Sequence, residues 1–319
     1  VEPTAVGNYQ GFLGARVARK SLRVEQARAG AIDQIVPVHD PAAWPVEVRV
    51  VAVNGQVWTG RGDDAEATFP PLTSIPAADL PDENMCSIAL RFRYGRFDYF
   101  TGGDLPGDPE GAPAWHGIEQ KVGAAIGPTD VHQVNHHGSI DPATPSFLAA
   151  LRSRVLVVPA WAPTHPSPDA LKRMLNPRYY PEPRDVFVLA LREPMTHAIG
   201  ARVQQLKSTL GHVVVRVAPG GRSYQVFVLD ARSPARLVTA RFGLVGGTRS
   251  TAGAPIDVCA TGLAAAPESN LYRCPGCLAP ICQPGLTNVP LRNLGNHAVD
   301  DPNGRLIADV RIGFMMHHA

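Results

Sequence analysis

Short apolar and β-branched runs alternate with amphipathic stretches along the first three quarters of the chain. The apolar runs predict strands at residues 46–53, 56–59, 87–92, 97–101, 131–134, 155–158, 186–189, 213–217 and 224–229. Amphipathic stretches at 145–152 and 169–175 predict short helices, and an Arg-, Ala- and Leu-rich stretch within 11–29 predicts another. Residues 60–83 are polar and Pro-rich, which indicates a loop.

Strands that alternate with short helices are typical of an α/β fold. From about residue 242 onward, neither the period of a strand nor that of a helix persists, and lysine is absent. Four of the chain's 5 cysteines also lie in this part. We therefore expect one domain over residues 1–240 and an irregular, Cys-containing extension over 241–319, which is either loosely ordered or foreign to the domain.

Composition and charge narrow the class of protein only a little. The chain has 319 residues, 45% hydrophobic and 18% charged, which is a normal balance for a globular protein. A net charge of +2 gives no electrostatic argument for a nucleic-acid or membrane surface as partner. The apolar runs are too short to span a bilayer, and the first residues show no signal-peptide pattern. The sequence gives no indication of an oligomeric state.

Potential metal ligands follow three of the predicted strands, each just past the strand's end. Asp104 follows the strand at 97–101, His136 and His137 follow the strand at 131–134, and His165 follows the strand at 155–158. Functional sites of α/β sheets gather at strand ends, and carboxylate and imidazole suit a catalytic zinc or manganese. Each signal is weak alone, because an Asp after a strand is more often a cap and a lone His is more often solvated. The argument therefore depends on the three segments occurring in this order.

The same segments carry a resemblance to a known family. The stretch 84–95 (NMCSIALRFRYG), the T-G-G-D at 101–104, the N-H-H-G-S at 135–139 and the H-P at 165–166 occur in order. Together they resemble the C-terminal half of metallo-β-lactamase-fold proteins of the ComEC-related, competence-protein type. The resemblance covers roughly residues 31–240.

This resemblance implies an αββα sandwich, of which the chain would hold a part, with one or two zinc or manganese ions at its edge. It implies that Asp104 and His137 bind metal, that His136 contacts a substrate phosphate, and that His165 is a site-edge or proton-transfer residue. The implied activity is metal-dependent hydrolysis of a small-molecule or nucleic-acid phosphodiester. Relatives of this type generally work outside the cytoplasm. A non-catalytic binding module and a lactone or thioester metallo-hydrolase remain as alternatives.

The chain departs from the family's pattern in one respect. The superfamily's first ligand motif, H-x-H-x-D-H, does not occur, and the early pair His39-Asp40 lies beside a Pro-rich loop. The chain is truncated, the missing half comes from elsewhere, or the site is degenerate. We favour truncation, because the sequence opens in the middle of the family's pattern.

The cysteines of the extension suggest a second metal site. Cys274, Cys277 and Cys282 have the spacing of a zinc knuckle, and Cys259 or His297 would complete four ligands. A second C-x2-C pair, which would make the prediction specific, is absent. The adjacent His317-His318 pair is interpreted as having no function.

Overall fold

The computed structural model describes most of the chain between residues 5 and 246, and several short strands after residue 246. The described residues are 5–20, 22–37, 45–232, 237–246, 264–265, 272–273, 299–300, 306–307 and 310–314. The His39-Asp40 pair, the zinc-knuckle residues with Cys259 and His297, and the His317-His318 pair lie outside the described residues.

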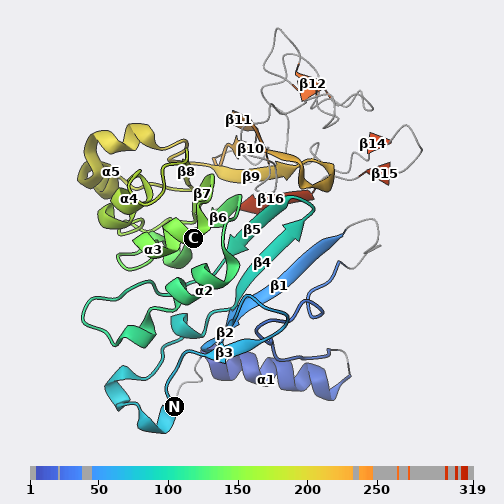
Figure 1. Ribbon diagram of the computed structural model, residues 1–319, viewed down its shortest axis with the longest axis vertical. Coiled ribbons are helices and arrows are strands. Elements are labelled where there is room, and N and C mark those ends of the chain that lie inside the picture. The colour runs from blue at the N-terminus through green and yellow to red at the C-terminus, as the bar shows by residue number, and fades with distance from the viewer. Residues whose placement is uncertain are drawn as a thin grey trace.

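An eight-stranded mixed sheet, the large sheet, forms the centre of the molecule (Figure 1). Its order is β3-β2-β1-β4-β5-β6-β7-β8, where the neighbours from β3 to β5 are antiparallel and those from β5 to β8 are parallel. The strands are β1 (Val46–Val53), β2 (Gln56–Trp58), β3 (Ala65–Ala67), β4 (Ala89–Tyr94), β5 (Phe97–Thr101), β6 (Val131–Gln133), β7 (Val155–Val158) and β8 (Asp185–Val188).

Three short helices connect the parallel strands, one in each crossover. They are α2 (Ile118–Ile126), α3 (Pro145–Leu151) and α4 (Pro168–Met174). Helices α3 and α4 begin where they do because each has proline in its first turn and a hydroxyl residue at the N-cap before it. The Thr144 side chain accepts from the Phe147 amide, and the Ser167 side chain accepts from the Ala170 amide.

Two further helices and seven short 3-10 turns complete the described helical structure. The helices are α1 (Ala5–Ala18) and α5 (Glu193–Ile199), and the turns are Leu72–Ser74, Ala77–Asp79, Asn84–Cys86, Ala114–His116, Asn135–Gly138, Gly200–Gln205 and Pro219–Gly221. None of the helices in the described residues is long and apolar enough to cross a membrane.

A second sheet of four antiparallel strands, the small sheet, packs on one face of the large sheet. Its order is β11-β10-β9-β16, with β9 (His212–Val217), β10 (Ser223–Leu229), β11 (Val238–Gly246) and β16 (Val310–Phe314). The domain boundary expected near residue 240 thus falls inside β11. Two separate strand pairs join β12 (Ala264–Ala265) to β13 (Tyr272–Arg273) and β14 (Val299–Asp300) to β15 (Leu306–Ile307).

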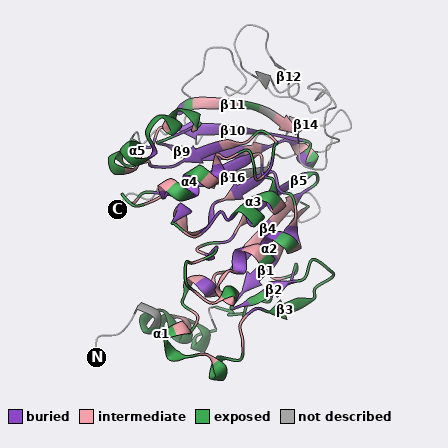
Figure 2. Ribbon diagram, turned by 60° about the vertical axis from the view of Figure 1, so that its left-hand side comes forward, coloured by how far each residue is buried: buried purple, intermediate pink, exposed green. Residues whose placement is uncertain are grey.

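The hydrophobic core lies on both faces of the large sheet, so the body has three layers (Figure 2). Strand β7 shows how one sequence serves both faces. Val155 and Val157 pack against the small sheet, while Leu156 and Val158 pack against α3, α4 and α5. This period of two is the pattern of a strand buried on both sides. The structure is therefore mixed α/β, as the sequence predicts.

Several local predictions were wrong. The helix expected within 11–29 is α1, which ends earlier because Lys20 adopts a left-handed backbone with φ of 53°. The loop expected at 60–83 contains the short strand β3. Helices α2 and α5, which are only 9 and 7 residues long, were not predicted from the sequence. Helices of two turns give little periodic signal.

Candidate functional site

Three loops that follow β5, β6 and β7 begin side by side at the carboxyl ends of these strands in the large sheet. The register pairs Thr101 with Gln133 and Gln133 with Val157, and all three strands run in the same direction. The carboxyl ends of the strands therefore lie together. The first loop carries Asp104, the second carries His136 and His137, and the third carries His165.

The two positions of the T-G-G-D turn require glycine for different steric reasons. A Cβ on Gly102 would lie 2.5 Å from Asn135 Oδ1, so only glycine allows the second loop to approach this closely. Gly103 adopts φ of +60°, and its carbonyl accepts a 3.0 Å hydrogen bond from the His136 amide. The Asp104 amide in turn donates to Ser87 Oγ at 3.2 Å. The first two loops are thus fixed to each other through the backbone.

Three consecutive residues of the second loop have left-handed backbone. The φ angles are 45° at His136, 54° at His137 and 72° at Gly138. Such angles are uncommon for residues with a side chain, although histidine tolerates them better than most, and they cost free energy at each residue. A Cβ on Gly138 would also lie 2.9 Å from Cβ of Pro166. This backbone gives the adjacent imidazoles different partners.

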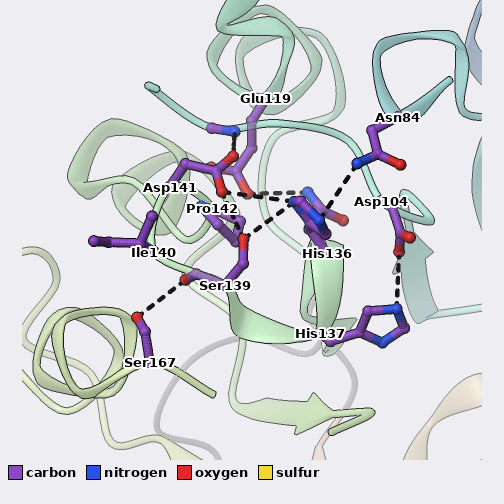
Figure 3. Close-up of polar contacts among 12 residues, drawn as sticks. Asn84, Asp104, Glu119, His136, His137, Ser139, Ile140, Asp141, Pro142 and Ser167 are labelled. Atoms are coloured by element: carbon purple, nitrogen blue, oxygen red, sulfur yellow. Dashed lines mark hydrogen bonds and ion pairs between the residues drawn. The ribbon is translucent and has the colours of Figure 1, made fainter. Parts of the chain in front are cut away.

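Asp104 and His137 form a direct pair (Figure 3). The distance from His137 Nε2 to Asp104 Oδ1 is 3.3 Å, and both side chains are partly exposed. On the other side of the ring, His137 Nδ1 lies 3.0 Å from the carbonyl oxygen of Pro159. A carbonyl only accepts, so Nδ1 carries a proton and donates. The neutral ring then has its lone pair on Nε2, directed at the carboxylate.

The pairing shifts the pKa of both groups. The hydrogen bond from His137 lowers the pKa of Asp104, and partial burial opposes this shift. The hydrogen bond to Asp104 raises the pKa of His137 against its own burial, with a further contribution from the Pro159 carbonyl. Both shifts favour the charged form of each partner, as expected for a carboxylate and an imidazole in direct contact.

His136 faces a different set of partners (Figure 3). Its Nδ1 lies 3.1 Å from Ser139 Oγ and 3.6 Å from Asp141 Oδ1. The Ser139 hydroxyl donates to the same Asp141 oxygen at 2.5 Å. The other ring nitrogen, Nε2, lies 3.4 Å from Nδ2 of Asn84, which comes from the 3-10 turn before β4.

His165 lies beside both imidazoles without a hydrogen bond to either. Its ring centroid is 6.0 Å from that of His137, nearly parallel to it, and 6.3 Å from that of His136. Its Nδ1 lies 3.1 Å from the hydroxyl of neighbouring Thr164. Trp161, from the same loop and 46% exposed, packs edge-on against His137 at 4.5 Å. The three predicted segments therefore meet, and a tryptophan lies at their border.

A buried carboxyl group lies on the inner side of the second loop. Glu119, at the start of α2, is fully buried and accepts from Asn135 Nδ2 at 2.9 Å and from the Ala143 and Thr144 amides at 3.0 Å each. Burial raises its pKa to about 7, against the lowering effect of these donors. We call Glu119, Asn135, Ala143 and Thr144 the inner cluster. It ties the second loop to α2 and to the start of α3.

Two side chains among the described residues have the chemistry of metal ligands. Asp104 Oδ1 and His137 Nε2 are donors of the right kind, and the Nδ1 bond of His137 to a carbonyl is the usual outer contact of a metal-binding histidine. Catalytic zinc sites take three protein ligands. Among the residues that the structure describes, no group of three or more His, Cys, Asp or Glu side chains is arranged to hold a metal ion. The pair thus fits part of a metal site.

Comparison with protein-family models and with curated proteins gives no match to this chain. The roles of its residues must therefore be argued from the geometry.

Several residues that contact the site were not predicted from the sequence to have a role in it. These are Asn84, Ser87, Glu119, Asp141 and Trp161. Only Asp141 carried a usable signal, because a carboxylate two residues after Ser139 often hydrogen-bonds locally. Asn84 and Glu119 are 52 and 16 residues from their partners in the second loop, and no spacing rule links them.

Proposed function

We propose that the chain is part of a metal-dependent hydrolase of the metallo-β-lactamase superfamily, which cleaves a phosphodiester. The observation that carries the proposal is the pair of Asp104 Oδ1 and His137 Nε2 at 3.3 Å, together with the bond of His137 Nδ1 to the Pro159 carbonyl. This arrangement presents one carboxylate oxygen and one imidazole lone pair to the same point.

The layers of the fold support the same proposal. The described body has helices, a large sheet and a small sheet in that order, which corresponds to three of the four layers of an αββα sandwich. The T-G-G-D and H-H-G-S segments each follow a strand, as the resemblance implies, and these two strands are parallel neighbours in the large sheet. The substrate class, a phosphodiester, comes from the resemblance and is supported by the presence of two more histidines beside the pair.

In this proposal, Asp104 and His137 hold a zinc or manganese ion, and at least one further ligand comes from outside the described residues. The metal would supply a water of lowered pKa and neutralise charge on the phosphate. The chain's own residues then have positional roles. The second loop sets His136 beside the metal ligands, and the third loop brings His165 and Trp161 to the border of the site.

The test is hydrolysis of bis-p-nitrophenyl phosphate by the full-length natural protein with zinc or manganese. Asp104→Ala and His137→Ala should each lower kcat/KM by roughly 10³-fold, the loss typical when one group that stabilises the transition state is removed. Asp169→Asn is the matched control, because Asp169 is an exposed carboxylate on α4 that pairs with nearby Lys172. Activity that survives in both alanine variants would reject this site.

A non-catalytic binding module is the second candidate, and one observation favours it. Among the described residues, no third His, Cys, Asp or Glu side chain joins Asp104 and His137 in a group that could hold a metal ion. Elemental analysis of the purified protein separates the two candidates. A protein without bound metal, whose melting temperature does not respond to added zinc, would support the binding module.

A further inference from the structure

The contacts of His136 determine where its proton lies. The ring has one nitrogen facing Ser139 and Asp141 and the other facing Asn84 (Figure 3). A neutral imidazole has one N–H donor and one lone pair, so each side of the ring must have the matching partner. Both sides can be assigned from the hydrogen bonds around them.

On the Nδ1 side, the hydroxyl proton of Ser139 is already used in a hydrogen bond to Asp141. The Ser139 hydroxyl has a single hydrogen, and it donates this hydrogen to Asp141 Oδ1 at 2.5 Å. The second oxygen of Asp141 accepts from the Gly107 amide at 3.0 Å, which fixes the carboxylate in place. Ser139 Oγ therefore offers only a lone pair to His136 Nδ1 at 3.1 Å. Nδ1 must be the protonated nitrogen.

The Nε2 side leads to the same assignment independently. Its neighbour is the amide nitrogen of Asn84, at 3.4 Å, and an amide nitrogen donates and never accepts. Nε2 must then offer its lone pair. The contacts on the two sides of the ring, one of them from Asn84, 52 residues before His136, thus require the same tautomer.

We propose that Ser139 and Asp141 are positioning residues that hold neutral His136 in the Nδ1–H tautomer and leave Nε2 unprotonated beside the Asp104–His137 pair. The consequence for the reaction rests on the proposed function. In that tautomer the Nε2 lone pair accepts from Asn84 Nδ2, and a water or a substrate hydroxyl would donate to it only in place of Asn84. His136 in that tautomer does not donate a hydrogen bond to a phosphate oxygen. This differs from the role that the resemblance implies, in which His136 contacts a substrate phosphate. The tautomer itself does not depend on the reaction.

The experiment is nitrogen NMR of the full chain labelled with ¹⁵N-histidine, well above the ordinary histidine pKa of about 6.5. The His136 signal is assigned by its loss in His136→Gln. We expect a pyrrole-type Nδ1 and a pyridine-type Nε2 for His136 in the unmodified protein. The reverse pattern overturns the inference directly.

The cause is tested in the double variant Ser139→Ala with Asp141→Asn. Without the serine oxygen and the carboxylate, the tautomer ratio of His136 should shift toward Nε2–H by roughly tenfold, the effect of losing one or two hydrogen bonds. Ser139→Thr keeps the hydroxyl and should keep the original ratio. An unchanged ratio in the double variant would show that Ser139 and Asp141 do not position the ring.

The matched control is Ser167→Ala. Ser167 Oγ donates to the Ser139 carbonyl at 3.1 Å and does not contact an imidazole, so this variant disturbs the same loop without changing the tautomer. The NMR result also separates this inference from the proposed function. An Nδ1–H ring in a protein without phosphodiesterase activity would leave the tautomer assignment standing and reject only the hydrolase.

Discussion

The second loop, residues 135–139, separates two polar clusters that are built in opposite ways. On its inner side, Glu119 is fully buried, and backbone amides supply two of its three donors. On its outer side, Asp104 and the three histidines are partly exposed, with Asp104 paired to His137 and the imidazole centroids 6.0, 6.3 and 6.5 Å apart. The difference indicates a division of roles. The inner cluster holds the loop, and under the proposed function the outer cluster binds the metal and the substrate.

Removal of the buried carboxylate should give the largest loss of stability. Glu119→Ala leaves three buried donors without an acceptor and opens a cavity, so we expect a cost of about 3–5 kcal/mol in the free energy of unfolding. Glu119→Gln keeps an oxygen for Asn135 and Ala143 and should cost about 1–2 kcal/mol. Urea denaturation measures both variants.

The contrast with the outer cluster gives the control. Asp104→Ala should cost less than about 1 kcal/mol, because the Asp104 side chain is 38% exposed and an exposed ion pair contributes little. The division of roles fails if Asp104→Ala destabilises the protein as much as Glu119→Ala does.

A buried histidine without partners should produce the next largest effect, through pH. His132 in β6 is fully buried between Phe100 and Phe147, and neither ring nitrogen has a hydrogen-bond partner. Burial lowers its pKa from 6.5 to about 3. The unfolded chain therefore binds a proton that the folded one does not, and stability falls as pH falls from about 6.5 toward 3. At pH 5 the loss is about 2 kcal/mol.

His132→Leu removes this term. Relative to the unmodified protein, the variant should gain about 1.4 kcal/mol in unfolding free energy for each pH unit below 6.5. Glu119 acts in the opposite sense. Because its folded pKa is raised to about 7, its contribution is present at low pH and is lost as pH rises from about 4.5 through 7. A stability difference between His132→Leu and the unmodified protein that does not vary with pH would contradict the assignment.

The smallest expected effect, a difference of about 1 kcal/mol between two variants, concerns the close approach of the second and third loops. Gly138→Ala combines left-handed strain with a Cβ only 2.9 Å from Cβ of Pro166, and we expect a cost of about 2 kcal/mol. Gly220→Ala is the matched control, because Gly220 has φ of 70° and ψ of 12° with nothing within 4 Å. It should cost about 1 kcal/mol, from the strain alone. Equal costs in thermal unfolding would mean that the Pro166 contact is unimportant.

Much of the fold could be predicted from the sequence, because the buried strands have uniform patterns. The strands at 97–101 and 155–158 were predicted to the residue, since runs of β-branched and aromatic side chains are bounded by turns. The helix α2 was missed, although it carries Glu119. An isolated acidic residue in a short segment gives no sign that it will be buried.

The candidate site was predictable only in its strand-end residues. Asp104 and the histidines stand out because each follows a strand, and parallel strands bring such residues together. Their partners do not stand out. Asn84 reaches His136 from an irregular turn, and the Pro159 carbonyl that orients His137 is a backbone group with no sequence signature. Contacts of this kind depend on the three-dimensional meeting of loops.

The left-handed run at His136, His137 and Gly138 also restricts how this loop can vary by mutation. At His136 and His137 the left-handed backbone already disfavours β-branched and bulky residues, whereas asparagine, aspartate and glycine adopt it more readily. A random mutational library at 136 and 137 would thus lose variants for two unrelated reasons, misfolding and lost binding. Libraries limited to asparagine, aspartate and glycine would keep the loop's shape and report on the imidazoles alone.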